Sequence, residues 1–296
     1  MNTPRVLFVG RTTLDALYWL DRLPEEDTKI YARDFKAAPG GPASNAAITH
    51  ALLGGKTTLL SAIGEGPWAA SVRAELSSLG IDLIDLAEGT AYEMPLCSIL
   101  VNTASATRTI VNPPLSNVAL KPLGNSWNPT WGAIPTVVLT DGFHLNETAA
   151  LLAGCHDAGA ALCLDGGSWK PGTEELTSLL TVAICSQRFA VPGQSSDPDA
   201  TLSWLAKKEV RHAAITRGAQ SILGLDQGRR FEIDVRNIAA ADTLGAGDVL
   251  HGAFCYHFAR TREFQPSLRL ASEIATRSCR QLGIQSWATH QADNPI

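Results

Sequence analysis

Short apolar runs alternate with helical stretches along this chain, and that alternation constrains the fold more than any other feature. The runs are continuous, as is typical of strands buried on both faces of a parallel sheet. Strand–helix–strand repetition predicts an α/β layered fold. The expected strands are Arg5–Val9, Thr57–Ile63, Thr136–Leu139, Ala160–Asp165, Val182–Ser186 and Ala213–Thr216, and the expected helices are Ser44–Leu53, Trp68–Leu79, Glu147–Ala158, Glu174–Leu180, Asp199–Lys207, Gly247–Arg260 and Ser267–Leu282.

Two regions break this rhythm. Asp15–Phe35 alternates between apolar and polar residues, and Met94–Val111 contains two short apolar runs around a polar segment. The second region is typical of a hairpin with one solvent-facing side. Together they predict a small antiparallel sheet inserted into the α/β body. A further hairpin is expected at Ser221–Leu225 and Arg230–Val235.

Composition excludes several classes of protein. The 296 residues are 45% hydrophobic and 18% charged, with a net charge of −5, so a packed core is expected and a nucleic-acid binder is disfavoured. No apolar run approaches the ~18 residues of a membrane span, and the first one is too short for a signal peptide. We therefore expect a soluble, cytoplasmic chain. The six scattered cysteines favour neither zinc nor disulfides.

The first glycine-rich segment is Gly40–Ala47. Ser44 is expected to cap the following helix, and Asn45 can both donate to and accept from hydroxyl groups. A ligand site and an ordinary turn with a helix cap are both open here. Nearby, Gly55–Thr57 imitates the end of a P-loop, but it follows a helix and opens a strand, so we reject that reading.

The strongest motif is the thirteen-residue segment 242–254. Its turn of Gly245, Ala246 and Gly247 delivers the chain into a helix, and small residues leave backbone N–H groups open to an anion. Asp248 falls in the first turn of that helix. A carboxylate there can accept a proton from a substrate hydroxyl while the amides hold a phosphate. Taken on the turn alone, a purely structural role for Asp248 at the helix N-terminus is equally open.

Segment 242–254 resembles the C-terminal signature of the PfkB, or ribokinase-like, carbohydrate kinase family, and segment 40–45 resembles its N-terminal signature. The resemblance continues between them and covers essentially the whole chain. It implies a three-layer α/β/α ribokinase-like fold and one kinase domain over residues 1–296. A small β-sheet lid would be inserted from about 12–39 and 91–113.

The resemblance also implies a reaction, namely transfer of the γ-phosphoryl group of ATP to a hydroxyl, usually a sugar hydroxymethyl group. Mg²⁺ would accompany the ATP. Asp248 would be the catalytic base, and Gly245–Gly247 would form the anion hole. The other implied positions are Asp15, Gly41 and Asn45 for sugar hydroxyls, Thr216 and Gly218 for the nucleotide, and Asp242 and Thr243 for a monovalent cation such as K⁺, whose use varies between members.

One segment departs from the family pattern. Many members carry Asn-x-x-Glu after the strand matching Val182–Cys185, and its acid helps to position magnesium. Here the segment reads Ser186-Gln187-Arg188-Phe189, so both marked positions differ. Asp165–Lys170 follows another strand and can replace part of that charge. Lys170 is a candidate for the ATP phosphates, and an exposed loop lysine is an equally open reading.

Three further residues are substrate candidates. If one face of the expected strand 28–33 covers the sugar, Lys29 pairs with an anion or a hydroxyl; otherwise it is a solubilising charge on an edge strand. Arg108 in the hairpin carries the same two readings. Asn112 follows the hairpin and either contacts a hydroxyl or ends the strand.

The identity of the substrate stays open at this point. A nucleoside kinase would stack its base on Tyr18, Trp19 or Phe35, and a kinase for a phosphorylated or sulfonated sugar would use Lys29 and Arg108. A catalytically weak sugar-binding regulator is a third alternative, suggested by segment 186–189. Similarity to ketohexokinase-like and modified-fructose kinases favours a ketohexose. Lids of this type often pair between subunits, which implies a homodimer through the lid.

Overall fold

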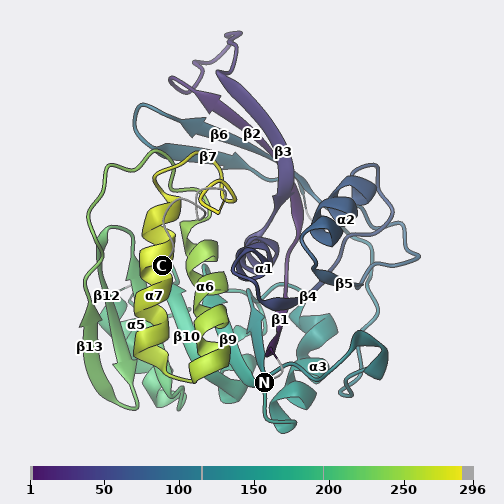
Figure 1. Cartoon of the computed structure of the whole chain (residues 1–296), viewed down its shortest axis with the longest axis vertical. Helices are drawn as coiled ribbons and strands as arrows, with labels where there is room; N and C mark the ends of the chain where they lie inside the picture. The colour runs from purple at the N-terminus through teal and green to yellow at the C-terminus, as the bar shows by residue number, and fades with distance from the viewer. Residues whose placement is uncertain (1–2, 115, 196, 289–296) are drawn as a thin grey trace.

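The computed structural model describes residues 3–114, 116–195 and 197–288. Nine strands within these ranges form one large sheet (Figure 1). It is parallel from β5 to β11 and ends in an antiparallel hairpin, so its central strands are buried on both faces. In spatial order the strands are β13 (Arg229–Ile233), β12 (Gln220–Asp226), β11 (His212–Arg217), β10 (Leu180–Ser186), β9 (Ala161–Gly166), β8 (Val137–Thr140), β1 (Arg5–Val9), β4 (Lys56–Ser61) and β5 (Asp82–Asp85).

Helices cover both faces of the large sheet, which confirms the predicted three-layer α/β/α fold (Figure 1). One face carries α1 (Pro42–Leu52), α6 (Ala246–Thr261) and α7 (Phe264–Ser278), the other carries α3 (Leu145–Asp157) and α5 (Pro198–Lys207), and α2 (Ala69–Ser78) packs beside β5. The chain reverses direction across the sheet after β5, and right-handed crossovers then place α3 and α5 on the face opposite α1.

The predicted elements occur with shifted ends. The helix expected at Glu174–Leu180 is much shorter, because only α4 (Thr173–Leu176) is an α-helix there. A 3₁₀ turn at Thr177–Leu179 follows it, and Leu180 already belongs to β10. A second 3₁₀ turn lies at Pro129–Trp131.

Four strands form a small sheet that projects beyond the body in the order β3-β2-β6-β7 (Figure 1). Their bounds are β3 (Asp34–Gly40), β2 (Thr13–Leu20), β6 (Leu96–Asn102) and β7 (Thr107–Val111). The prediction of a purely antiparallel sheet was wrong for the central pair, because β2 and β6 are parallel. Each of these strands leaves the body in the same direction, from a different insertion, and each returns through its own antiparallel partner.

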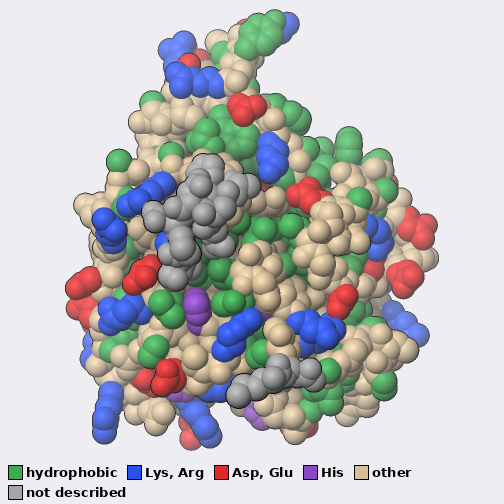
Figure 2. Space-filling view, viewed as in Figure 1, with side chains coloured by type: hydrophobic (Ala, Val, Ile, Leu, Met, Phe, Trp, Pro, Cys, Tyr) green, Lys and Arg blue, Asp and Glu red, His purple; other side chains and the backbone are tan. Residues whose placement is uncertain are grey.

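The strand predicted at 28–33 was wrong. Residues 21–33 form an irregular loop, and β2 pairs with Asp34–Gly40 instead. Arg33 closes this loop by an ion pair to Asp21 and by its amide, which donates to the Trp19 carbonyl. Lys29 is therefore an exposed loop residue rather than one of a strand face. Figure 2 shows basic side chains gathered on this projecting end of the molecule.

The expected capping role of Ser44 was also wrong. Helix α1 begins at Pro42, and Gly41 precedes it with φ 90°, a left-handed value that favours glycine. Proline at the first helical position needs no amide partner, so the helix starts two residues earlier than predicted. Ser44 consequently lies inside the first turn, where its Oγ is buried without a hydrogen-bond partner among the described residues.

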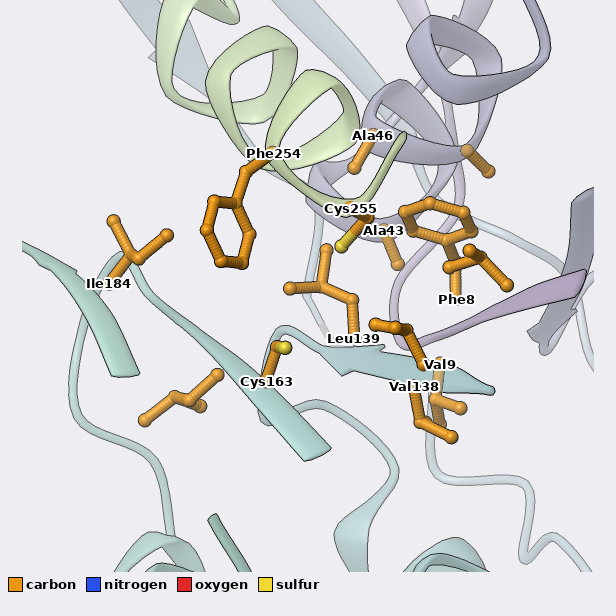
Figure 3. Packing of buried hydrophobic residues seen from close by; sticks show 14 of the residues in the cluster. Phe8, Val9, Ala43, Ala46, Val138, Leu139, Cys163, Ile184, Phe254 and Cys255 are labelled. Atoms are coloured by element: carbon orange, nitrogen blue, oxygen red, sulfur yellow. The ribbon is translucent and has the colours of Figure 1, made fainter. Parts of the chain in front are cut away.

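The main core lies between the large sheet and the α1–α6 layer. Phe254 and Cys255 of α6 point toward Leu139, Cys163 and Ile184 of the sheet (Figure 3). All six cysteines are free, and five of them are buried, as expected for cysteine used as a small hydrophobe. No helix in the described ranges is long and apolar enough to cross a membrane.

Candidate active site

A cavity of about 690 Å³ opens between the small sheet and the body. It lies beyond the carboxyl ends of the parallel strands, where open α/β sheets place their ligands. Residues from both signature segments line it, although they are far apart in the sequence. The predicted site residues that it brings together are Asp15, Gly41, Asn45, Arg108, Asn112, Thr216, Gly218, Thr243, Gly245, Ala246, Gly247 and Asp248.

Asp248 lies at the point where two helices begin. Gly245 takes a left-handed conformation with φ 67°, and α6 starts at the next residue, so Asp248 falls in its first turn. A side chain on Gly245 would also overlap Ile284. Asn45, in the first turn of α1, donates a hydrogen bond from Nδ2 to Oδ2 of Asp248 over 2.8 Å. The two signatures therefore meet in one side-chain contact.

The environment of Asp248 favours its protonated form. Desolvation raises the pKa of Asp248 well above its ordinary value, and the Asp165 carboxylate raises it further, whereas the Asn45 hydrogen bond lowers it. Asp165 lies next to the end of β9 and is 5% exposed, and its Oδ2 lies 3.4 Å from Nδ1 of His251. A carboxyl group with a raised pKa is suited to exchange protons near neutral pH.

The first turn of α6 leaves amide groups open to the cavity. Val249 donates to the Gly245 carbonyl, and Ala246 makes a long 3.4 Å bond to the Thr243 carbonyl. The amides of Gly247 and Asp248 have no partner among the described residues, as expected for the start of a helix. These N–H groups and the helix dipole together can hold an anion beside the Asp248 carboxylate.

Asp15 is a buried carboxylate in the cavity wall, on β2 of the small sheet. Thr13 donates to it through Oγ1 over 2.6 Å. Burial raises the pKa of Asp15, while the Thr13 hydrogen bond and the charge of Arg11 lower it. Gly40 lies opposite, and a Cβ there would overlap the carboxylate. The close approach of β3 to Asp15 thus requires glycine, which explains the first glycine of the signature.

The tip of the small sheet contacts the loop before α6. Arg108 of β7 donates from Nη1 to Oγ1 of Thr243 over 3.0 Å. Oγ1 of Thr243 in turn donates to the carbonyl of Ala106 over 3.3 Å. The small sheet is therefore tied to the turn that carries Gly245–Gly247, and the cavity is closed on that side.

Three predicted residues lie outside the cavity lining. Lys29 is exposed in the loop between β2 and β3. Lys170 turns back on its own loop, where Nζ donates to the Ser168 carbonyl over 3.1 Å and lies 4.6 Å from the Phe143 ring. Asp242 is buried and accepts hydrogen bonds from the amides of Leu244 and Gly283.

Some lining residues escaped the sequence analysis, above all Arg11 and Thr13. Both lie within four residues of the end of β1, Thr13 as the first residue of β2, so the rule that ligands gather beyond strand ends was the available signal. Segment 186–189, which departs from the family pattern, is divided between the cavity and the core. Ser186, Gln187 and Arg188 line the cavity, whereas Phe189 is 1% exposed and packs in the core.

A family model described as pfkB family carbohydrate kinase matches residues 3–291. The chain belongs to the pfkB family of carbohydrate kinases. This confirms the resemblance seen in the two signature segments. Members of the pfkB family are ATP-dependent kinases that use ATP with Mg²⁺, so the chain is an enzyme of that class.

Individual relatives of this pfkB protein agree with the family. A ribokinase of Bacillus subtilis is 21% identical over 95% of this chain and 94% of its own length. Ketohexokinase of Mus musculus is 28% identical over 38% of this chain and 37% of its own length. The crystal structure of a putative ribokinase from Agrobacterium tumefaciens has a TM-score of 0.82 at 22% identity, covering 99% of this chain and all of the other.

Proposed function

We propose that the protein transfers the γ-phosphoryl group of ATP to a hydroxymethyl group of a sugar, with Asp248 as the general base. The observation that carries this proposal is the Asn45–Asp248 hydrogen bond at the start of α6, beside unpartnered amides. A proton acceptor and an anion hole thereby occupy the same end of the cavity. That juxtaposition is what in-line phosphoryl transfer to an alcohol needs.

The chain's own residues carry each part of the reaction. Asp248 accepts the proton of the attacking hydroxyl as the oxygen–phosphorus bond forms. The amides of the Gly245–Gly247 turn and of Asp248 stabilise negative charge on the phosphoryl oxygens. The small sheet acts as a lid, since its contact through Arg108 and Thr243 covers the cavity and excludes water that would hydrolyse ATP.

The sugar end of the cavity is assigned to residues of the lid and of α1. Asp15 accepts from one sugar hydroxyl, Asn45 orients the reacting one, and Asn112 contacts another from the lid. Gly41 allows the sugar to approach the backbone closely. The aromatic side chains that a nucleoside kinase would use to stack a base, Tyr18, Trp19 and Phe35, do not line the cavity, which favours a sugar.

The nucleotide end is assigned to the β11 edge. Thr216 and Gly218 line it, and Arg188 adds a cation there. No group of three acidic, histidine or cysteine side chains in the described ranges is arranged to hold a metal alone. Mg²⁺ prefers phosphates and one or two carboxylates, so Asp165 fits an ion that arrives with ATP. Bound Mg²⁺ neutralises phosphate charge.

Two finer assignments belong to the same proposal. The loop of Asp242 and Thr243 binds a monovalent cation, supported by the buried Asp242 carboxylate just before α6. Two copies pair through the lid, supported by the edge strand β7, whose Ile110 and Val111 are 44% and 57% exposed. Mass measurement by light scattering tests the second assignment, and kinetics in K⁺ against choline tests the first.

An ADP-release panel tests the proposed reaction. The acceptors are free sugars, sugar phosphates, sulfosugars and nucleosides, and Asp248→Asn is the control. We expect release above the control with a sugar or sugar derivative that bears a hydroxymethyl group. ADP release with nucleosides alone would show that the acceptor is a nucleoside and not a sugar. No release with any acceptor would contradict catalysis and favour a sugar-binding regulator.

A further inference from the structure

Arg11 lies directly beyond the end of β1 and lines two adjacent cavities. The first is the candidate active site, and the second has a volume of about 440 Å³. The second cavity lies on the side of the β5 edge, and its wall includes Trp68, Tyr92 and His144. Neither Asp248 nor Asn45 lines it. Arg11 therefore stands where the active-site cavity continues away from the reacting end.

The guanidinium of Arg11 lacks partners. It makes no hydrogen bond and no ion pair with any residue in the described ranges, and its Nη2 is buried. Arg5 and Arg73, by contrast, are ion-paired with Asp82 and Asp85. A buried cationic donor without a partner is costly and rare in folded proteins. An acceptor group in the cavity would satisfy this nitrogen.

The protein holds Arg11 in place without using its hydrogen-bonding edge. The backbone amide of Arg11 donates to Oδ2 of Asp141 over 2.9 Å. The guanidinium carbon lies 5.2 Å from the centre of the Phe143 ring, a cation–π contact. This contact uses none of the guanidinium N–H donors and leaves them available. That arrangement suits an anion with two or three oxygen atoms.

The two cavities place Arg11 at one end of the site. Asp15, Asn45 and Asp248 line only the first cavity, whereas Arg11 lines both. Glu93 also lines the second cavity, but it forms no ion pair with Arg11. A substrate that presents its hydroxyl to Asp248 can therefore reach Arg11 where the two cavities meet.

We propose that the acceptor substrate carries an anionic group, and that Arg11 binds it at the end opposite the reacting hydroxymethyl group. This rests on the proposed function and narrows its substrate class to phosphorylated, sulfonated or carboxylated sugars. The two residues that the sequence suggested for such an anion, Lys29 and Arg108, are placed differently. Lys29 lies outside the cavity, and Arg108 donates to Thr243. The anion site is on the body of the protein, not on the lid.

Matched acceptors test the proposal. We would measure kcat and KM for a ketohexose, its 6-phosphate, its 6-sulfonate and a sugar acid of the same length. A charge-assisted contact predicts a kcat/KM about ten- to a hundredfold higher for one of the anionic acceptors than for the neutral sugar. The three anionic arms distinguish phosphate, sulfonate and carboxylate. An enzyme that prefers the neutral sugar overturns the proposal.

Arg11→Gln then assigns the preference to this residue. The variant should raise KM for the anionic acceptor by about ten- to a hundredfold, with kcat nearly unchanged and the neutral sugar little affected. Arg22→Gln is the matched control, because Arg22 is an exposed lid arginine 3.9 Å from Glu25. An equal loss for charged and neutral acceptors would show that Arg11 only stabilises the site, and would contradict the proposal.

A binding experiment on the unmodified protein covers the case in which Arg11→Gln does not fold. Without ATP, the anionic acceptor should raise the melting temperature more than its neutral counterpart, and added salt should reduce the difference. Equal stabilisation by both acceptors overturns the proposal. If no acceptor releases ADP, the proposed reaction fails, yet this measurement still decides whether an anion binds.

Discussion

Asn45 Nδ2 donates to Asp248 Oδ2 over 2.8 Å, although the two residues are 203 positions apart in the chain. The contact joins the first turn of α1 to the first turn of α6, which pack side by side in the layer above the large sheet. It orients the carboxylate toward the cavity and partly offsets the desolvation that raises its pKa. The proposed catalytic base is therefore held by a contact between two packed helices.

Asp248→Asn should fold and lose turnover, because an amide cannot accept the proton of the attacking hydroxyl. We expect kcat to fall by about a hundred- to ten-thousandfold, the usual contribution of a general base. Steady-state ADP release measures it. Asp199→Asn is the matched control, since Asp199 forms an exposed ion pair with Arg230 and should lose little. Near-native turnover of Asp248→Asn would remove this residue from the base role.

The same substitution should make the protein more stable at neutral pH. The pKa of Asp248 is raised in the folded state above its ordinary value of 3.8, so the folded state keeps a proton that the unfolded chain releases. Stability is highest below pH 3.8 with respect to this group and falls as pH rises toward the raised pKa. Asparagine carries no ionisable proton and removes this loss, so the free energy of unfolding should rise by about 1 kcal/mol at pH 7.

Denaturant unfolding of wild type and Asp248→Asn at several pH values checks this sign. The difference in stability between the two proteins should shrink toward zero as the solution is acidified. The Asp248 carboxyl group of the wild type is then protonated in both the folded and the unfolded state. A variant that is less stable than wild type at pH 7 would show that the Asn45 contact outweighs desolvation.

Asn45→Ala should move the pH dependence of catalysis. The rate falls on acidification as Asp248 becomes protonated, and the Asn45 hydrogen bond lowers the pKa at which this happens. Removing the hydrogen bond raises that pKa, so the acidic limb of kcat/KM should shift to higher pH. A pH profile of kcat/KM decides the point. An unchanged acidic limb with a reduced rate would limit Asn45 to orienting the sugar.

Gly40→Ala should mimic the loss of Asp15. The methyl group added at position 40 would overlap the Asp15 carboxylate and displace it. Asp15→Ala removes the carboxylate itself. Both changes should raise the sugar KM by about ten- to a hundredfold, the range of a hydrogen bond to a charged group. Gly124→Ala is the control, because no described atom lies within 4 Å of its new methyl group. An unchanged sugar KM in Asp15→Ala would exclude Asp15 from the sugar site.

The layered fold was readable from the sequence because its cause is local. A strand buried on both faces must be apolar throughout, and Arg5–Val9 was predicted to the residue for that reason. Turn chemistry was less secure. Proline at position 42 starts α1 earlier than the Ser44 cap suggested, and the loop at residues 21–33 replaced an expected strand. Alternation of polarity in a short exposed segment does not specify a strand, since no buried face enforces it.

The cavity was only partly readable. The role proposed for Gly245–Asp248 rests on a local turn, which fixes the open amides and the place of the carboxylate. Arg11 has no such motif around it. Its proposed role follows from which side chains surround it and which do not, and those neighbours come from the segment after β8 and from the segment between β5 and β6.

The sequence alone predicted the layered α/β fold, the family and the place of the proposed reacting end, because these depend on local patterns of polarity and on two short signature segments. Only the tertiary structure decided which charges face the cavity. It placed Lys29 in the solvent, turned Arg108 toward Thr243 and left Arg11 without a partner beside Asp15. The strength of an ionic interaction depends on the distance between the charges and on their burial. For residues far apart in the sequence, both are set only when the two sheets and the helices pack together.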